Sequence, residues 1–237
     1  MDEAGVANRA LQLPADSIKD GISVDFVAVP WGAALGDSYY DTMLMDMSVF
    51  EAGIQAEEEG YDAVCIDTVS DSGMYALRSR LNIPVLGPGQ AAFHVACMLG
   101  HKFSVITMWD EWFHLYRKVL TEYKLESRCA SLRSINTRPD LEELLAGKEE
   151  VIFEKLEKES LRAIQEDGAD VIVLGSTTMH QSHGFLQQAL PVPVINPGLM
   201  SYKLCEIFLE TGLTHSKTAF PAPQQPNDQF ILSRVPD

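Results

Sequence analysis

The chain has 237 residues, of which 46% are hydrophobic and 22% are charged, and its formal net charge is −16. This composition is typical of a folded globular protein with enough material for one large domain or two lobes. A strongly acidic chain lacks the basic surface that nucleic acids and anionic membranes require, so we expect neither as a partner.

Apolar runs alternate with helical patterns along the whole chain. Strands that are separated by helices form βαβ units, and this arrangement predicts an α/β protein with parallel sheets flanked by helices. In chain order we predict a strand at 22–29, a helix at 43–59, a strand at 62–66, a helix at 72–81, a strand at 84–86, a helix at 90–99, a strand at 103–108, a helix at 112–123, a strand at 130–136, a helix at 149–166, strands at 171–174 and 192–195, and a helix at 199–210. The segment from Pro221 onward is rich in Pro and Gln and is predicted to be coil.

The chain repeats itself with a period near 108 residues. Residues 58–68 and 166–176 share one pattern, and residues 83–89 and 192–198 share a second. A repeat of this length predicts two pseudo-symmetric lobes, with residues 1–100 plus 201–237 forming lobe 1 and residues 101–200 forming lobe 2. We expect the active site at the interface of the lobes.

The repeat also predicts a gap in lobe 1. A shift by 108 residues places 22–29 on 130–137, but it places the counterpart of strand 103–108 before Met1. The first strand of lobe 1 is therefore expected to be missing. The favoured interpretation is that the given sequence starts downstream of this strand. The alternative is that lobe 1 is built differently from lobe 2.

Each copy of the repeat carries a short hydroxyl side chain directly after its buried strand, Thr68 in one and Ser176 in the other. Ligands of open parallel sheets bind beyond the carboxyl ends of the strands, where hydroxyls and backbone N–H groups can hold an anion. Capping of the following helices is the alternative role, and the matched placement in both copies favours binding. We therefore expect a small anionic substrate, bound by Val69, Ser70, Asp71, Thr107, Trp109, Thr177 and Thr178 around Thr68 and Ser176.

A general base would complete this site. His180 follows Ser176 by four positions and is our catalytic candidate, and Asp67 is the alternative in the other copy. A solvated helix position is the other interpretation of His180, and a helix cap is the favoured role of Asp71. The acidic and histidine residues match no standard metal motif, so no metal is expected.

The four cysteines have no CxxC spacing, which indicates reduced thiols in a cytoplasmic protein. Cys65, Cys97 and Cys205 are expected to be core thiols. The acidic N-terminus does not fit a signal peptide, and no stretch is apolar enough to span a membrane. Residues 87–90 lack the glycine spacing of a dinucleotide turn, so no nucleotide cofactor is expected.

Two segments carry a resemblance to a known family. Asp-Ala-Val-Cys-Ile-Asp-Thr-Val-Ser-Asp-Ser-Gly at 62–73 and Val-Ile-Val-Leu-Gly-Ser-Thr-Thr-Met at 171–179 resemble the two signature strands of the aspartate/glutamate/hydantoin racemase superfamily. Residues 83–87 and 212–217 resemble its hydantoin-racemase branch, and the likeness covers about residues 22–220. The resemblance implies two similar lobes, no cofactor, a homo-oligomer, and two cysteines that remove and return a proton on opposite faces of a carbon acid.

The chain departs from this pattern because Thr68 and Ser176 stand where the family has its cysteines. A free thiol has a pKa of about 8.5, whereas an alcohol is a far weaker acid and needs an adjacent base. We expect the two-thiol mechanism to be lost. The hydroxyl and backbone N–H groups around Thr68 and Ser176 are expected to keep their capacity to bind an anion. The resemblance predicts a cofactor-independent racemase or isomerase for a small carboxylate or cyclic ureide. A decarboxylase or lyase that stabilises an enediolate, and a non-catalytic anion-binding protein, are the alternatives.

Overall fold

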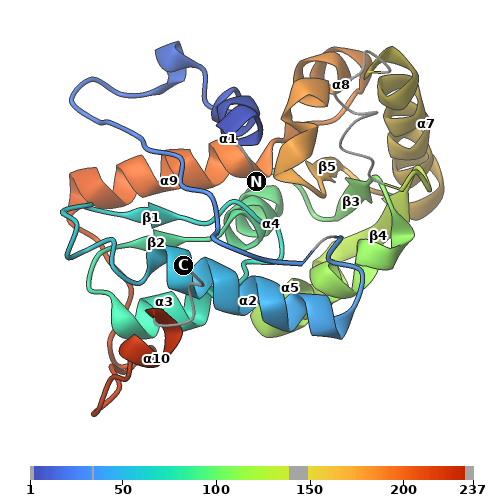
Figure 1. Ribbon diagram of the computed structural model, residues 1–237. Coiled ribbons are helices and arrows are strands. Elements are labelled where there is room, and N and C mark those ends of the chain that lie inside the picture. The colour runs from blue at the N-terminus through green and yellow to red at the C-terminus, as the bar shows by residue number, and fades with distance from the viewer. Residues whose placement is uncertain (1–2, 34, 139–148, 233–237) are drawn as a thin grey trace. The chain divides into compact units, whose positions relative to one another are not determined.

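The computed structural model describes residues 3–33, 35–138 and 149–232, and its elements are labelled in Figure 1. The chain divides into two compact units. The first contains residues 1–66, 71–87 and 201–237, and the second contains residues 67–70 and 88–200. Helix α4 (Pro88–Leu99) thus belongs to the second unit, whereas the division based on the repeat assigned it to the first. None of the described helices is long and apolar enough to cross a membrane.

The second unit is built on a four-stranded parallel sheet with the strand order β4-β3-β5-β6. Its strands are β3 (Phe103–Thr107), β4 (Cys129–Ser134), β5 (Val171–Leu174) and β6 (Val194–Ile195). Each of the four overlaps a strand that the sequence predicted. Phe103 of β3 is paired with Val171 of β5, and Ile172 of β5 is paired with Val194 of β6. The two strands of the second copy of the repeat, β5 and β6, thus lie side by side in the sheet.

Helices cover both faces of this sheet. On one face, Val171 and Val173 pack into a cluster with residues of α4 and α5 (Phe113–Tyr123). On the other face, Ile172 and Leu174 pack with residues of α7 (Glu149–Asp167) and α8 (His183–Ala189). A strand that is buried on both faces must be apolar at every position, which explains the unbroken Val-Ile-Val-Leu run of β5.

An ion-pair network fixes α7 on the edge strand β4. The Arg133 guanidinium donates Nε to Asp167 Oδ2 at 2.5 Å and Nη2 to Asp167 Oδ1 at 2.9 Å, and Nη2 also reaches Glu166 Oε2 at 2.7 Å. The two parallel bonds to Asp167 have the bidentate geometry that makes arginine–carboxylate pairs strong. Hydrogen bonding to Arg133 lowers the pKa of the Asp167 carboxyl below its usual value.

The first unit has a two-stranded parallel sheet of β1 (Val64–Cys65) and β2 (Val85–Leu86). By the repeat, these strands correspond to β5 and β6 of the second unit. Among the described residues of the first unit, no strand corresponds to β3. The predicted strand 22–29 is wrong, since this segment is extended but has no regular secondary structure. Its counterpart β4 forms a ladder on β3, and the described part of the first unit offers no such partner.

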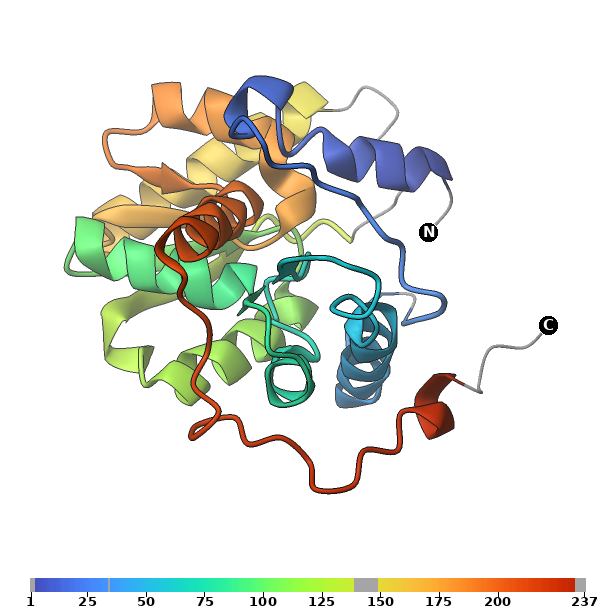
Figure 2. The same cartoon turned by 90° about the vertical axis from the view of Figure 1, so that its left-hand side faces the viewer.

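The helices of the first unit agree more closely with the sequence prediction than its strands do. Helix α2 (Tyr39–Gly53) begins at the N-cap Ser38, whose hydroxyl accepts a hydrogen bond from the Asp41 N–H at 3.1 Å, and turns continue to Gly60. The remaining helices are α1 (Glu3–Ala10), α3 (Met74–Arg80), α9 (Pro197–Thr211), which enters from the second unit, and α10 (Gln229–Leu232). The predicted C-terminal coil is thus largely confirmed, with one short helix in it, as Figure 2 shows in red.

The segment after α9 caps the end of α3. Lys217 donates its ammonium group to the carbonyl oxygens of Arg78 at 2.9 Å and Ser79 at 3.1 Å, and also to that of Leu81. The last carbonyls of a helix have no partner inside the helix, so a cation at this position satisfies them and interacts favourably with the helix dipole. Desolvation lowers the pKa of Lys217, as expected for an ammonium group that is drawn into this cluster of carbonyls.

We expect Lys217→Met to destabilise the protein by about 1–2 kcal/mol, because the substitution removes the ammonium donor from the Arg78 and Ser79 carbonyls. The Leu81 carbonyl keeps its contact with His215 Nε2. The midpoint of urea unfolding measures the loss. Lys158→Met, on the exposed face of α7, is the matched control and should leave the midpoint unchanged. Equal effects of the two substitutions would mean that the cap contributes nothing.

The stability should also depend on pH through Asp167. Its pKa is lowered in the folded protein, so its contribution is complete above the usual Asp value of about 3.9 and is lost as the pH falls through the folded pKa. Asp167→Asn should therefore be less stable than the parent chain at neutral pH, and this difference should shrink below about pH 4. Unfolding curves over a pH series test this, with the exposed Glu154→Gln as control. A difference that is independent of pH would contradict the assignment.

Candidate functional site

A buried hydrogen-bond network stabilises the turn after β5 on its interior side. The Tyr116 hydroxyl donates to the Gly175 carbonyl at 2.7 Å and shares a hydrogen bond of 2.7 Å with Thr107 Oγ1. Burial raises the pKa of Tyr116 far above its usual value, so the phenol stays protonated and can donate. Thr107 was expected to contact substrate, but it is completely buried and instead supports the turn from inside.

Only glycine fits at position 175, because the backbone there lies very close to Thr107 and Tyr116. A Cβ atom built there would lie 2.7 Å from Thr107 Cβ and 2.8 Å from the Tyr116 hydroxyl, closer than real Cβ contacts allow. The Gly175 N–H continues the sheet by donating to the Ile106 carbonyl at 2.8 Å. Ser176 therefore follows directly from a rigid strand end, which is a good support for a binding group.

Ser176 caps its own turn and is paired with Thr178. Its hydroxyl accepts from the Thr178 N–H at 3.2 Å and shares a hydrogen bond of 2.7 Å with Thr178 Oγ1. The Met179 N–H donates to the Ser176 carbonyl at 3.1 Å. Two of the backbone N–H groups that we expected to face an anion are thus used inside the turn. The partly exposed hydroxyl pair of Ser176 and Thr178 is what this turn offers to a ligand.

Thr177 joins this turn to the segment that carries Thr68. Its hydroxyl donates to the Asp67 carbonyl at 3.2 Å, and the Lys118 ammonium group reaches the Ser70 carbonyl at 3.5 Å. Residues 67–70 consequently belong to the second unit, together with Ser176. The bond from Thr177 to Asp67 holds the segment of residues 67–70 against the turn that carries Ser176, within the second unit.

Within this segment Asp67 and Thr68 are the two residues that are partly open to solvent. Thr68 is partly exposed, whereas Val69 and Ser70 are 4% and 2% exposed. Val69 packs into the hydrophobic cluster on the α4 and α5 face of the sheet. The burial of Val69 and Ser70 assigns them to anchoring the segment, although both were expected to bind substrate.

Asp71 lies in the first unit and does not cap α3, contrary to expectation. The N-cap of α3 is Gly73, and the Gly73 N–H donates to Asp46 Oδ1 at 3.0 Å. Asp71 is 4% exposed with a φ of 51°, and its carboxylate packs against Gly87, where a Cβ would come within 2.4 Å of Oδ1. A positive φ is uncommon for a residue other than glycine, and such backbone strain tends to occur at functional sites.

His180 directs its ring toward its own turn. Nδ1 lies 3.1 Å from the Thr177 carbonyl, and Nε2 is buried. Nδ1 must carry the proton to bond a carbonyl, and neither nitrogen is presented to solvent. The neighbouring His183 places Nε2 3.1 Å from the Val194 carbonyl and serves the fold of α8. Trp109 is half-buried beside the α7 and α8 cluster, with the Arg138 guanidinium 6.0 Å from its ring.

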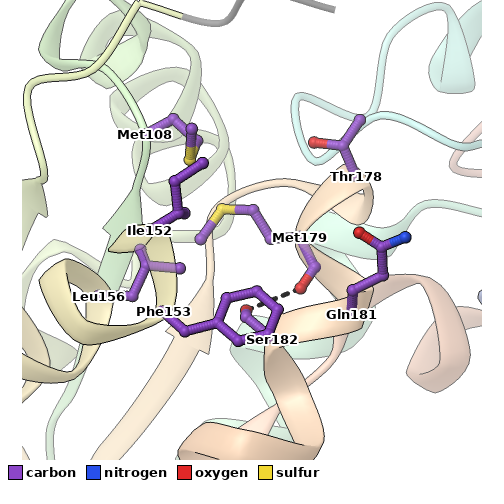
Figure 3. Close-up of a pocket in the computed structure, with 8 residues that line it drawn as sticks. All are labelled: Met108, Ile152, Phe153, Leu156, Thr178, Met179, Gln181 and Ser182. Atoms are coloured by element: carbon purple, nitrogen blue, oxygen red, sulfur yellow. Dashed lines mark hydrogen bonds between the residues drawn. The ribbon is translucent and has the colours of Figure 1, made fainter. Parts of the chain in front are cut away.

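A small hollow lies beside Thr178 in the second unit (Figure 3). Its volume of about 20 Å³ is enough for one water molecule and too small for an organic ligand. The Met179 side chain extends toward Ile152 and Met108 across it, as Figure 3 shows. Residues 139–148, which precede α7, lie outside the described residues. In the part of the chain that the structure describes, no cluster of histidine, cysteine and acidic side chains could hold a metal ion.

Comparison with known proteins identifies the family. The profile of the family "Asp/Glu/Hydantoin racemase" matches residues 7–205. The chain belongs to the Asp/Glu/hydantoin racemase family. It is 32% identical over 191 residues to a hydantoin racemase of Pseudomonas sp. (strain NS671), covering 81% of this chain and 76% of the relative. It is 35% identical over 164 residues to a hydantoin racemase of Rhizobium meliloti, covering 69% of this chain and 66% of that relative.

Two solved structures share the fold of this family member over nearly the full chain. An allantoin racemase from Pseudomonas fluorescens superimposes with a TM-score of 0.86 at 26% identity, covering 94% of each chain. An allantoin racemase from Klebsiella pneumoniae gives a TM-score of 0.85 at 27% identity, covering 94% of this chain and 90% of that one. The expected family and two-lobe fold class are thereby confirmed. The placement of the site between the lobes stays a prediction.

Thr177→Val should loosen the segment that carries Thr68, because it removes the hydroxyl that holds the Asp67 carbonyl. We expect faster amide hydrogen exchange in a peptide spanning residues 67–70, with little change in β3 or β5. Thr178→Val is the matched control, since its hydroxyl bonds Ser176 and leaves the contact with Asp67 intact. Unchanged exchange in Thr177→Val would show that this bond does not position the segment.

Proposed function

We propose that the chain is a cofactor-independent racemase that acts on a small cyclic ureide of the hydantoin or allantoin type. The single observation that carries the proposal is the match to hydantoin and allantoin racemases over most of the chain. The substrates of those relatives share a five-membered ureide ring whose stereogenic carbon lies next to a carbonyl group. Removal of the proton from this carbon gives a planar enolate, and the negative charge collects on the carbonyl oxygen.

The hydroxyl groups are suited to holding that oxygen. One hydroxyl hydrogen is used between Ser176 Oγ and Thr178 Oγ1, so the pair retains one hydrogen that can be donated to a ligand. Thr68 adds a second hydroxyl from the segment that Thr177 holds. Preorganised donors aimed at a developing oxyanion lower the barrier without reorganisation, and this role does not require an acidic side chain.

A single base is sufficient for racemisation without the two thiols. A planar enolate that is protonated by water on either face loses its configuration, and the protonated base gives its proton to the hydroxide that remains. Two groups beside the hydroxyls can accept the first proton, His180 and Asp67. Because both ring nitrogens of His180 are directed into the protein, we favour Asp67, a partly exposed residue, as the base.

The test follows single enantiomers of a 5-substituted hydantoin and of allantoin in D₂O. We expect optical activity and the NMR signal of the ring-carbon proton to disappear together, faster than with heat-denatured protein. Ser176→Ala should lower kcat/KM by about 10²–10³-fold if its hydroxyl serves the oxyanion. Asp67→Asn and His180→Gln, each checked by thermal melting, separate the two candidate bases.

The same experiment decides between the alternatives. Absence of exchange for the folded parent chain with both substrates overturns the proposal. Thermal stabilisation by a ureide or dicarboxylate without turnover would support a binding protein, which is favoured by the loss of both cysteines. Release of CO₂ from substituted malonates would support a decarboxylase. A double variant, Thr68→Cys with Ser176→Cys, should racemise faster than the parent chain, because it restores the family's thiols at their positions.

A further inference from the structure

The hydroxyl pair of Ser176 and Thr178 borders the small hollow of the second unit. Thr178 shares a hydrogen bond of 2.7 Å with Ser176 and also lines the hollow beside Met179, as Figure 3 shows. A ligand oxygen that binds to the hydroxyl pair therefore has this hollow as its neighbour. In a cyclic ureide, the carbonyl oxygen and the substituent of the stereogenic carbon are attached to adjacent ring atoms. A ring that is held at its oxygen thus places its substituent within reach of the hollow.

The inner wall of the hollow is made of hydrocarbon groups. Met108 and Leu156 are each 1% exposed and belong to the cluster on the α7 and α8 face of the sheet, and Ile152 packs against that cluster. Ser182 also lines the hollow, but its hydroxyl donates to the Met179 carbonyl at 2.8 Å. A hydrocarbon group is stabilised against such a wall, whereas a polar group loses its hydrogen bonds to water without replacement.

The Met179 side chain determines the size of the hollow. Its backbone is held at both ends, because the N–H donates to the Ser176 carbonyl at 3.1 Å and the carbonyl accepts from Ser182. Its side chain extends across the hollow toward Met108 and Ile152 (Figure 3). A methionine side chain is unbranched, has three rotatable bonds and adapts to irregular spaces. A change of its rotamer enlarges the hollow while the turn that carries the hydroxyls stays in place.

The opposite side of the hollow is less adaptable. Phe153 of α7 lines it, and the ring of Phe153 packs on Phe185 of α8 with 5.7 Å between the ring centroids and 32° between the planes. Aromatic pairs at this separation attract each other beyond the area they bury, which holds Phe153 in its position. The part of the lining that can adjust to a ligand is therefore Met179.

Resting on the racemase function proposed above, we propose that this hollow binds a hydrocarbon substituent of the substrate and that Met179 determines which substituents fit. A volume of about 20 Å³ accepts a group of the size of a water molecule, such as a methyl group, without rearrangement. A longer alkyl chain enters when Met179 turns aside. The ureido substituent of allantoin carries several hydrogen-bonding groups, which the inner wall does not satisfy. The preferred substrates are thus 5-alkylhydantoins with short side chains rather than allantoin.

The experiment compares kcat/KM for racemisation of 5-methyl-, 5-isobutyl- and 5-benzylhydantoin and of allantoin. The parent chain should prefer 5-methylhydantoin and act most slowly on allantoin. Met179→Ala should raise the ratio of the 5-isobutyl to the 5-methyl value by about tenfold or more, because space for one methylene changes discrimination by at least this factor. Ile152→Ala, at the opposite end of the Met179 side chain, should change the ratio in the same direction.

Met98→Ala is the matched control. Met98 is 83% exposed on α4, so its truncation should leave the ratio unchanged. Thermal melting checks that each variant is folded. If Met179→Ala is unfolded, Met179→Leu replaces it, since leucine has a similar volume but a shorter, branched side chain. Met179→Leu should retain turnover of 5-methylhydantoin and lower the ratio of the 5-isobutyl to the 5-methyl value.

An unchanged ratio in folded Met179 and Ile152 variants, with an active parent chain, overturns the role of Met179 and leaves the racemase function standing. Faster turnover of allantoin than of 5-methylhydantoin overturns it as well. A parent chain that racemises none of the four compounds refutes the racemase function, and NMR of the methionine methyl groups then decides on the hollow alone. The Met179 signal, assigned with Met179→Leu, should shift with 5-isobutylhydantoin and not with allantoin. Absence of the shift ends the proposal.

Discussion

The Tyr116 hydroxyl determines the geometry of the turn on which the candidate site depends. Because it bonds Gly175 and Thr107 at once, β5 must end with its backbone pressed against α5, and only glycine fits there. The next three residues then have fixed and different environments. Ser176 and Thr178 are partly exposed and paired with each other, while Thr177 is buried and reaches the Asp67 carbonyl. One buried phenol thus supports both hydroxyl segments.

Replacing a thiol by a hydroxyl exchanges acidity for hydrogen-bonding strength. A thiolate can accept a proton from carbon, whereas a serine or threonine hydroxyl is a much better hydrogen-bond donor than a thiol. The turn after β5 uses two of its own N–H groups internally, so the hydroxyls provide most of its capacity to bind an anion. The proposed function therefore assigns stabilisation of the charged intermediate and removal of the proton to different residues.

The sequence predicted β3, β5 and β6 well because these strands are buried at every position, which leaves mainly apolar runs. The prediction of a strand at 22–29 was wrong. Alternating polarity indicates a half-buried segment, but it does not indicate whether a neighbouring strand is present to pair with it. The hydroxyl positions Thr68 and Ser176 were found from the repeat. The supports Tyr116 and Lys118 were missed, because a hydrogen bond between distant helices and loops leaves no periodic signal.

Side-chain direction was the second limit of prediction. Thr107 and His180 were placed on the right elements, but the sequence does not specify which way a side chain turns, and both form hydrogen bonds inside the protein. Cys65 was expected to be a core thiol but is exposed, and the sequence could not predict this either. A Val-Cys-Ile run indicates a strand, whereas the burial of that strand depends on whether neighbours cover it.

The division of the chain between the units has a consequence for biosynthesis. The second unit is nearly continuous in sequence, from residue 88 to residue 200, so all but four of its residues emerge from the ribosome in one block. The first unit requires residues from both sides of this block, including Lys217 at the end of α3. Domains fold as their residues become available during translation. The unit to which the earliest of these residues belong is therefore completed only after the second unit has emerged.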